Sequence, residues 1–247
     1  CTIGDTVWDG NFYQKSMYKK GQYDLTFSQH SSTLGSATIV EGRLISLGTN
    51  TFSDLTAQTL DEWVESTDEN ASDHYAVIIL NQGDNLNGSL TTGKKSTIEF
   101  RGLKATSVTG ITNAGTINLL NGTEIQVGNN DIESGHDPDV KSTFSSTGCI
   151  QLQDAIFRAF LDISLTGKVT TLANNHLSTF SANSLSIDGQ SGAELSMGIG
   201  SNTVNITKDL SLSSNARADI SGTLLVGGKT DLSGGSILDL NVMGENR

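Results

Sequence analysis

Short runs in which polar and apolar residues alternate recur along the C-terminal third of the chain and constrain its fold more than any other feature. Each run is only a few residues long and has the two-residue period of a half-buried β-strand. Gly, Asn, Ser and Asp separate the runs, and these residue types favour turns. The clearest runs cover 184–189, 194–197, 203–207, 209–213, 218–222 and 236–242.

The same pattern fills the middle of the chain, over 97–102 and 110–129. An Asp-Leu-Ser triplet at Asp209 recurs at Asp231, a separation close to one coil of a β-helix. A hairpin sheet would also give short alternating strands. The solenoid is favoured because the inward positions are nearly all Leu, Ile or Val and because aromatic residues are only 6% of the chain. We therefore expect an all-β fold, a right-handed parallel β-helix in which each coil pairs with the next.

Few residues are charged, and most of the charged residues are acidic. Asp and Glu number 27 against 15 Lys and Arg, giving a net charge of −12, yet charged residues are only 17% of the chain. Uncharged hydroxyl and amide side chains must therefore supply the polar surface. The acidic balance argues against nucleic acid as a partner, because no basic stripe is present to neutralise phosphates. No apolar run is long enough for a membrane-spanning helix, and we expect any signal peptide to have been removed.

The stretch Ile111–Leu119 and the Leu-Ser-Ile and Leu-Ser-Leu ladder over 184–242 resemble the passenger domains of bacterial autotransporters and filamentous-haemagglutinin-like adhesins. The resemblance covers residues 86–130 and 162–242. It implies an extracellular protein at the bacterial cell surface that binds a host-cell or matrix protein, a glycan or identical chains. It also implies that the chain is a passenger, or the first part of one, that continues or was cleaved after Arg247.

Residues 1–247 are expected to form one domain, with regular coils over 86–247 and a cap containing an inserted helix over 1–85. Large side chains are concentrated near the N-terminus, at Trp8, Phe12, Tyr13, Met17, Tyr18, Tyr23 and Phe27. A cap that covers the open end of the solenoid is favoured for this region. The alternative is an aromatic platform for a ligand.

Two segments interrupt the strand pattern and are expected to be short extruded helices or loops. In 54–65, Leu55, Leu60, Trp63 and Val64 lie near one face of a helix for which Asp54 would be the N-cap. In 150–161 the apolar spacing fits a helix better than a strand, although a strand also accommodates it. The loops over 54–73 and 129–148 are the expected specific binding elements.

The densest group of candidate metal ligands lies in one acidic loop. Asp131, Glu133, Asp137 and Asp139 surround a glycine there, and calcium prefers several oxygen ligands. Their spacing does not match an EF-hand or a repeating calcium-binding nonapeptide. A solvated acidic loop is therefore the simpler interpretation. We expect no cofactor, with calcium at these four residues as the alternative.

Two cysteines, Cys1 and Cys149, suggest a disulfide if the chain is secreted. A lipid-anchored N-terminus and an arbitrary start of the chain are the alternative explanations of Cys1.

The expected function is adhesion or self-association through an extended polar face, without catalysis. A polysaccharide lyase, glycosidase or tailspike-like depolymerase is the alternative, because β-helices host such enzymes. Asp188, Asp209, Asp219, Asp231 and Asp239 would have to align on one face for that chemistry. A structural subunit of a surface filament or layer is the third hypothesis.

Overall fold

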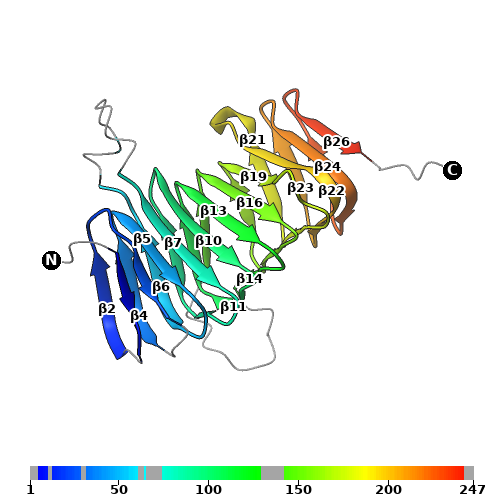
Figure 1. Ribbon diagram of the computed structural model, residues 1–247. Helices are drawn as coiled ribbons and strands as arrows, with labels where there is room; N and C mark the ends of the chain where they lie inside the picture. The colour runs from blue at the N-terminus through cyan, green and yellow to red at the C-terminus, as the bar shows by residue number, and fades with distance from the viewer. Residues whose placement is uncertain are drawn as a thin grey trace.

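Every strand pair in the described chain is parallel and joins successive coils, so the molecule is a parallel β-helix (Figure 1). The computed structural model describes residues 5–10, 13–28, 32–60, 64, 74–128 and 142–241. The coils follow one another along a single stack from β2 (Tyr13–Lys19) at one end to β26 (Ile237–Asn241) at the other. This confirms the predicted β-solenoid.

The largest sheet has 15 strands and covers two sides of the stack. Its first column consists of β1 (Thr6–Trp8), β3 (Leu25–Phe27), β5 (Gly42–Ser46), β7 (Ala76–Asn81), β10 (Ser96–Arg101), β13 (Thr116–Leu120), β16 (Cys149–Gln153), β19 (Lys168–Thr171), the first parts of β22 (Glu194–Ile206) and β24 (Arg217–Val226), and β26. Its second column consists of β11 (Lys104–Val108), β14 (Glu124–Val127), β17 (Ile156–Ala159), β20 (Thr179–Ala182) and the remaining parts of β22 and β24. The long strands β22 and β24 join the two columns into one sheet.

Two smaller sheets form the remaining side. The seven-stranded sheet contains β2, β4 (Thr33–Ile39), β6 (Thr51–Ala57), β8 (Asn85–Leu86), β9 (Ser89–Thr92), β12 (Gly110–Asn113) and β15 (Thr143–Ser146). The four-stranded sheet contains β18 (Ile163–Leu165), β21 (Leu185–Asp188), β23 (Leu210–Ser213) and β25 (Thr230–Leu232). A short 3₁₀ helix, Gly189–Ser191, follows β21.

Aliphatic side chains stack along the axis and form the core. In the first column one uninterrupted ladder consists of Leu25, Leu44, Ile78, Ile98, Ile117, Ile150, Val169, Leu195, Ala218 and Leu238. All members from Leu44 to Ala218 are at most 2% exposed. Because side chains alternate between the two faces of a strand, the residues between these positions point to solvent. Leu, Ile and Val supply most of the core, as predicted, but Phe27, Phe52, Phe100, Phe157 and Phe180 are also fully buried.

Buried polar side chains satisfy the backbone where the coils bend. The amide of Asn202 donates to the carbonyls of Met197 (2.8 Å) and Ile199 (2.9 Å), and its Oδ1 accepts from the backbone N–H of Ser178 (3.1 Å). At another bend, the Asn113 amide donates to the Cys149 carbonyl at 3.2 Å. Without such partners a buried backbone group would be left unpaired at each corner.

Coil length is uneven because two segments are inserted between paired strands. Leu25 pairs with Leu44 in the next coil, whereas Leu44 pairs with Ile78 after a much longer stretch of chain. A second long stretch separates β13 from its partner β16. The two insertions coincide with the loops predicted over 54–73 and 129–148, and most residues of these loops lie outside the described chain.

The helix predicted over 54–65 is wrong at its beginning, because Thr51–Ala57 form β6 and Asp54 is therefore a strand residue and not an N-cap. Later in the same segment Val64 is helical, and its backbone N–H donates to the Leu60 carbonyl at 3.2 Å; the other residues of 61–73 lie outside the described chain. The helix predicted over 150–161 is wrong. The segment 150–161 contains β16 and β17. Asp154 between them has a φ of 50°, a left-handed conformation that ends any right-handed helix. Leu152 and Phe157 are buried because they stack on neighbouring coils rather than on one helical face.

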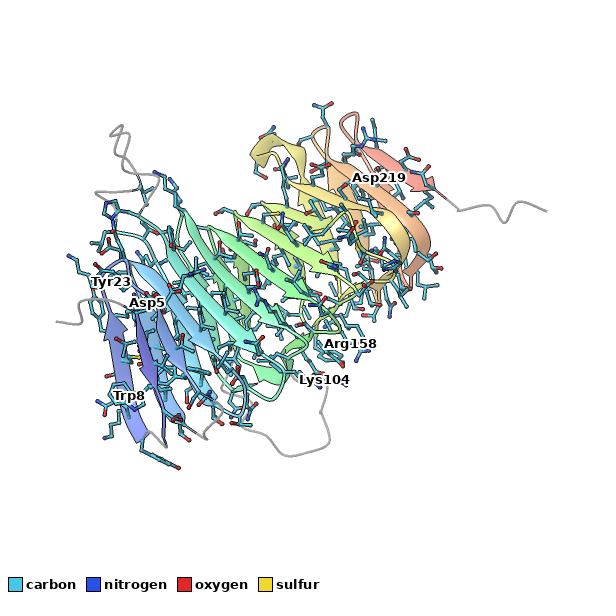
Figure 2. All side chains as sticks on the ribbon, in the orientation of Figure 1. Asp5, Trp8, Tyr23, Lys104, Arg158 and Asp219 are labelled. Atoms are coloured by element: carbon cyan, nitrogen blue, oxygen red, sulfur yellow. The ribbon has the colours of Figure 1, made fainter. Side chains whose placement is uncertain are left out.

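Parallel coils begin well before residue 86. β1 and β2 already pair with the second coil, so the segment predicted as a cap contains strands of the solenoid. Tyr13 and Tyr18 of this first coil are 84% and 64% exposed, and neither side chain covers the end of the core. Figure 2 shows Trp8 and Tyr23 at the same end of the stack.

Candidate binding face

The outward face of the seven-stranded sheet contains a straight row of hydroxyl side chains. The parallel register aligns Thr38 with Thr56, Thr56 with Thr91, Thr91 with Thr112, and Thr112 with Ser145. Neighbouring members are about 4.8 Å apart along the stack, because that is the spacing of hydrogen-bonded strands. We call Thr38, Thr56, Thr91, Thr112 and Ser145 the hydroxyl row.

The hydroxyl groups of this row are available to a ligand. Thr112 and Ser145 are exposed, and Thr38, Thr56 and Thr91 are partly exposed. Within the described chain none of the five side chains forms a hydrogen bond. Each hydroxyl can therefore donate a hydrogen bond to solvent or a bound molecule and can also accept one from it.

An exposed aromatic ring continues the row at the N-terminal end. Tyr18 pairs with Thr38, so it takes the next position of the same row in the first coil. Tyr13 pairs with Thr33 on the same two strands. This arrangement supports the aromatic platform that we considered for the N-terminal segment.

A second row lies beside the first and is partly occupied by internal contacts. It contains Ser36, Asp54, Ser89 and Thr143, with Gly110 between the last two. The carboxylate of Asp54 accepts from the backbone N–H (2.8 Å) and the hydroxyl (2.7 Å) of Ser89. Asp54 therefore links two successive coils.

The 15-stranded sheet presents a different chemistry, because it carries charged side chains and several of them form ion pairs. Arg43 contacts Asp24, Arg101 contacts Glu99, Arg158 contacts Glu124 and Lys168 contacts Glu194, at 2.5–3.2 Å. Figure 2 shows Arg158, which belongs to one of these pairs, and Asp219, whose carboxylate accepts from the Asn241 amide. The hydroxyl row, which contains no charged residue, is thus distinct from the salt-bridged surface of the larger sheet.

Two titratable groups are perturbed by burial near the N-terminal coils. Burial raises the pKa of the Asp84 carboxyl, although hydrogen bonds from Ser46, Asn81 and Asn50 act in the opposite direction. Burial lowers the pKa of Lys19, whose ammonium donates to the carbonyls of Gly21 (2.7 Å) and Glu41 (2.8 Å). Both groups therefore stabilise turns, and neither belongs to the hydroxyl row.

The predicted calcium ligands Asp131, Glu133, Asp137 and Asp139 lie outside the described residues. Within the part that the structure describes, no group of three or more His, Cys, Asp or Glu side chains could hold a metal ion. The calcium site stays a prediction.

Cys149 has a free thiol in β16. Its predicted partner Cys1 lies outside the described residues, so the disulfide stays a prediction. Five strands of the first column separate β16 from β1, the first described strand after Cys1.

The carboxylates considered for catalysis do not line up on one face. Asp219 and Asp239 are neighbours on the large sheet, whereas Asp231 pairs with Ser211 on the four-stranded sheet. Asp188 accepts from the backbone of Gln190, and Asp209 accepts from the backbone of Lys229. These last two carboxylates stabilise turns.

A shallow hollow at the edge of the large sheet also lacks paired carboxylates. It is lined by Ile45, Leu47, Asn81, Gln82, Arg101, Gly102 and Asn121. Arg101 is the single charged residue among these, and its guanidinium contacts Glu99. The lining therefore offers no acid–base pair.

The hydroxyl row was not predicted from the sequence. A signal for it exists, since two outward hydroxyl residues flank one inward residue at 36–38, 89–91 and 143–145. The members of the row, however, follow one another along the chain at unequal intervals, short from Thr38 to Thr56 and much longer from Thr56 to Thr91. Because the separations in sequence are unequal, no sequence repeat indicates that these residues form a regular row in the structure.

No protein-family model, no curated protein and no solved structure matches the chain. Within the described residues, no helix has the length and apolarity that are needed to cross a bilayer.

Proposed function

We propose that this chain is a binding module of an exported bacterial surface protein and acts as an adhesin or self-associating β-helix. The observation that supports the proposal is the hydroxyl row, an uncharged surface that extends over five consecutive coils and whose hydroxyls have no hydrogen-bond partner within the described chain. A paired parallel sheet holds these groups in fixed positions, so little conformational freedom is lost when a ligand binds. The resemblance of 111–119 and 184–242 to autotransporter and haemagglutinin-like passengers supports export.

Many weak contacts along a rigid face can sum to useful affinity. One exposed hydrogen bond contributes only about 0.5–1.5 kcal/mol net, so a single hydroxyl would not hold a partner. A ligand that spans the row engages several hydroxyls at once, and each added contact is made at high effective concentration. The row is thus suited to an extended partner and not to a small molecule held in a pocket.

The test compares two matched double variants. Thr91→Val with Thr112→Val removes two adjacent hydroxyls of the row, and Thr97→Val with Thr116→Val removes two adjacent hydroxyls of the large sheet. Valine preserves the shape and the β-branching, so both variants should fold with unchanged thermal midpoints.

Binding is measured for the wild type and both variants against bacterial and host cells, matrix proteins, glycans and the immobilised chain itself. We expect the Thr91/Thr112 variant to lose binding to the partner and the Thr97/Thr116 variant to retain it. Equal binding by all three proteins would refute the hydroxyl row as the binding surface. Concentration-dependent oligomers in size-exclusion chromatography would identify the partner as a second copy.

A further inference from the structure

The two ends of the hydroxyl row differ, and the N-terminal end adds an aromatic ring to the hydroxyls. Tyr18 takes the position next to Thr38 and is 64% exposed. Its ring forms no hydrogen bond or ring contact within the described chain. A tyrosine provides a flat apolar face together with a polar hydroxyl, which makes it a common side chain in binding surfaces.

The chemistry of the row argues against charged polymers as the natural ligand. The row from Tyr18 to Ser145 contains no Asp, Glu, Lys, Arg or His, and the whole chain has a net charge of −12. A polyanion would need Lys or Arg side chains to replace its counterions, and a nucleic acid would need a basic stripe. Because the row itself contains neither basic nor acidic side chains that could pair with a charged polymer, its partner is expected to be uncharged.

The pairing of the strands excludes a peptide that adds to the sheet alongside the middle of the row; of the row's strands, only β2 and β15, at its two ends, pair on one side alone within the described chain. β4, β6, β9 and β12 are each paired on both sides, so no free strand edge runs along the row. A peptide that binds by strand addition requires such an edge. What remains available is side-chain hydroxyl groups in a line, with one aromatic face at the end.

This combination matches one class of ligand, an uncharged sugar polymer. Sugar hydroxyls donate and accept hydrogen bonds in the same way as Ser and Thr hydroxyls, so the two surfaces can pair without charge. The C–H face of a pyranose ring is apolar and flat, and it can stack on the exposed ring of Tyr18. Repetition in the polymer lets successive units meet successive coils, which lie about 4.8 Å apart.

We propose that the surface formed by Tyr18 and the hydroxyl row binds a neutral, linear polysaccharide that lies along the axis of the β-helix. The inference rests on the proposed function, because it names the ligand class of the same face. Tyr18 stacks on one sugar, and Thr38, Thr56, Thr91, Thr112 and Ser145 hydrogen-bond to the following units.

Affinity electrophoresis and calorimetry test this with named probes. The neutral probes are a soluble β-glucan, a xylan, a galactomannan and a dextran, and the polyanionic probes are alginate and heparin. The proteins are the wild type, Tyr18→Ala, the Thr91/Thr112 double valine variant, and two controls. The controls are the Thr97/Thr116 double valine variant and Tyr23→Ala, which removes an exposed tyrosine outside the row.

We expect at least one neutral polysaccharide to bind the wild type, with affinity that grows with chain length and is insensitive to salt. Tyr18→Ala and the Thr91/Thr112 variant should each weaken binding about tenfold, which corresponds to about 1.4 kcal/mol of binding free energy. Both controls should stay close to the wild type. Unchanged circular dichroism melting curves establish that the variants are folded.

Other outcomes separate the ligand class from the proposed function. Binding of a neutral polysaccharide that is unchanged in both row variants would overturn the assignment of the surface. Preference for alginate or heparin, abolished by salt, would overturn the neutral ligand. If no polysaccharide binds but a cell, matrix or self-association partner is lost with the Thr91/Thr112 variant, the ligand class is wrong and the proposed function holds. If no partner of any kind depends on the row, both proposals fail.

Discussion

Replacing Leu152 by alanine tests the parallel register that builds the whole molecule. Leu152 is fully buried in β16, between Leu119 of the preceding coil and Thr171 of the following coil. Truncating a fully buried leucine removes apolar contacts and leaves a cavity, at a cost of about 2–5 kcal/mol. The adjacent Gln151 points outward and is partly exposed, so Gln151→Ala should change stability by no more than about 0.5 kcal/mol.

Urea denaturation followed by far-ultraviolet circular dichroism measures both variants. With a denaturant slope of about 3 kcal/mol per molar, a loss of about 3 kcal/mol lowers the midpoint of Leu152→Ala by about 1 M. Gln151→Ala should unfold close to the wild type.

Comparing Leu152→Ala with Gln151→Ala tests the register, because successive side chains of a strand point alternately inward and outward. A shift of one residue would exchange the inward and outward positions and make Gln151 the costly site. Equal losses for the two variants, or a larger loss for Gln151→Ala, would therefore refute the assignment of β16.

Three further predictions concern buried polar groups and the last coil. Asn202→Ala should destabilise the protein by at least about 2 kcal/mol in the same urea assay, because it leaves a buried backbone N–H and two carbonyls without their partner. The pKa of Asp84 is raised in the folded state, so the folded protein binds this proton more tightly than the unfolded chain does. The free energy of unfolding of the wild type, relative to that of Asp84→Asn, should therefore fall as the pH rises from about 4, the ordinary aspartate pKa, through the raised pKa. An opposite slope would contradict the burial of this carboxyl. Ile220 is fully buried whereas its partner Leu240 in the last coil is 48% exposed, so Ile220→Ala should lower the free energy of unfolding by about 2–5 kcal/mol and Leu240→Ala by about half as much, as measured by thermal and urea unfolding.

The strand content and the composition of the core could be predicted from the sequence because both depend on neighbouring residues. Alternation of polar and apolar residues over a short segment determines which side chains lie on the same face of a strand, independently of the rest of the chain. Runs such as Thr97–Arg101 and Leu210–Ser213 are strands with their apolar residues inward, as predicted. Leu, Ile and Val supply most of the narrow core, as the small share of aromatic residues predicts, together with five buried Phe side chains.

The segment 150–161 shows where local pattern is insufficient. Its apolar residues fit a helical face, yet Leu152 and Phe157 are buried by contacts with other coils. Phe157 stacks on Phe180, with ring centroids 5.4 Å apart, and this neighbour belongs to the following coil. Such a contact can outweigh a local preference, because burial of a large aromatic side chain is worth more than a difference in helix propensity.

By itself the sequence determined that this chain forms short alternating strands around an aliphatic core, with an acidic, hydroxyl-rich surface. The tertiary structure alone decided which hydroxyls form a row and that Tyr18 lies at its end. The reason is that a residue's neighbour along the axis depends on the length of the intervening coil. Those lengths differ widely even within the first column, where the coil from Leu25 to Leu44 is much shorter than the coil from Leu44 to Ile78. Neighbouring residues determine each strand, but the arrangement of side chains on the surface depends on the length of the segment between paired strands.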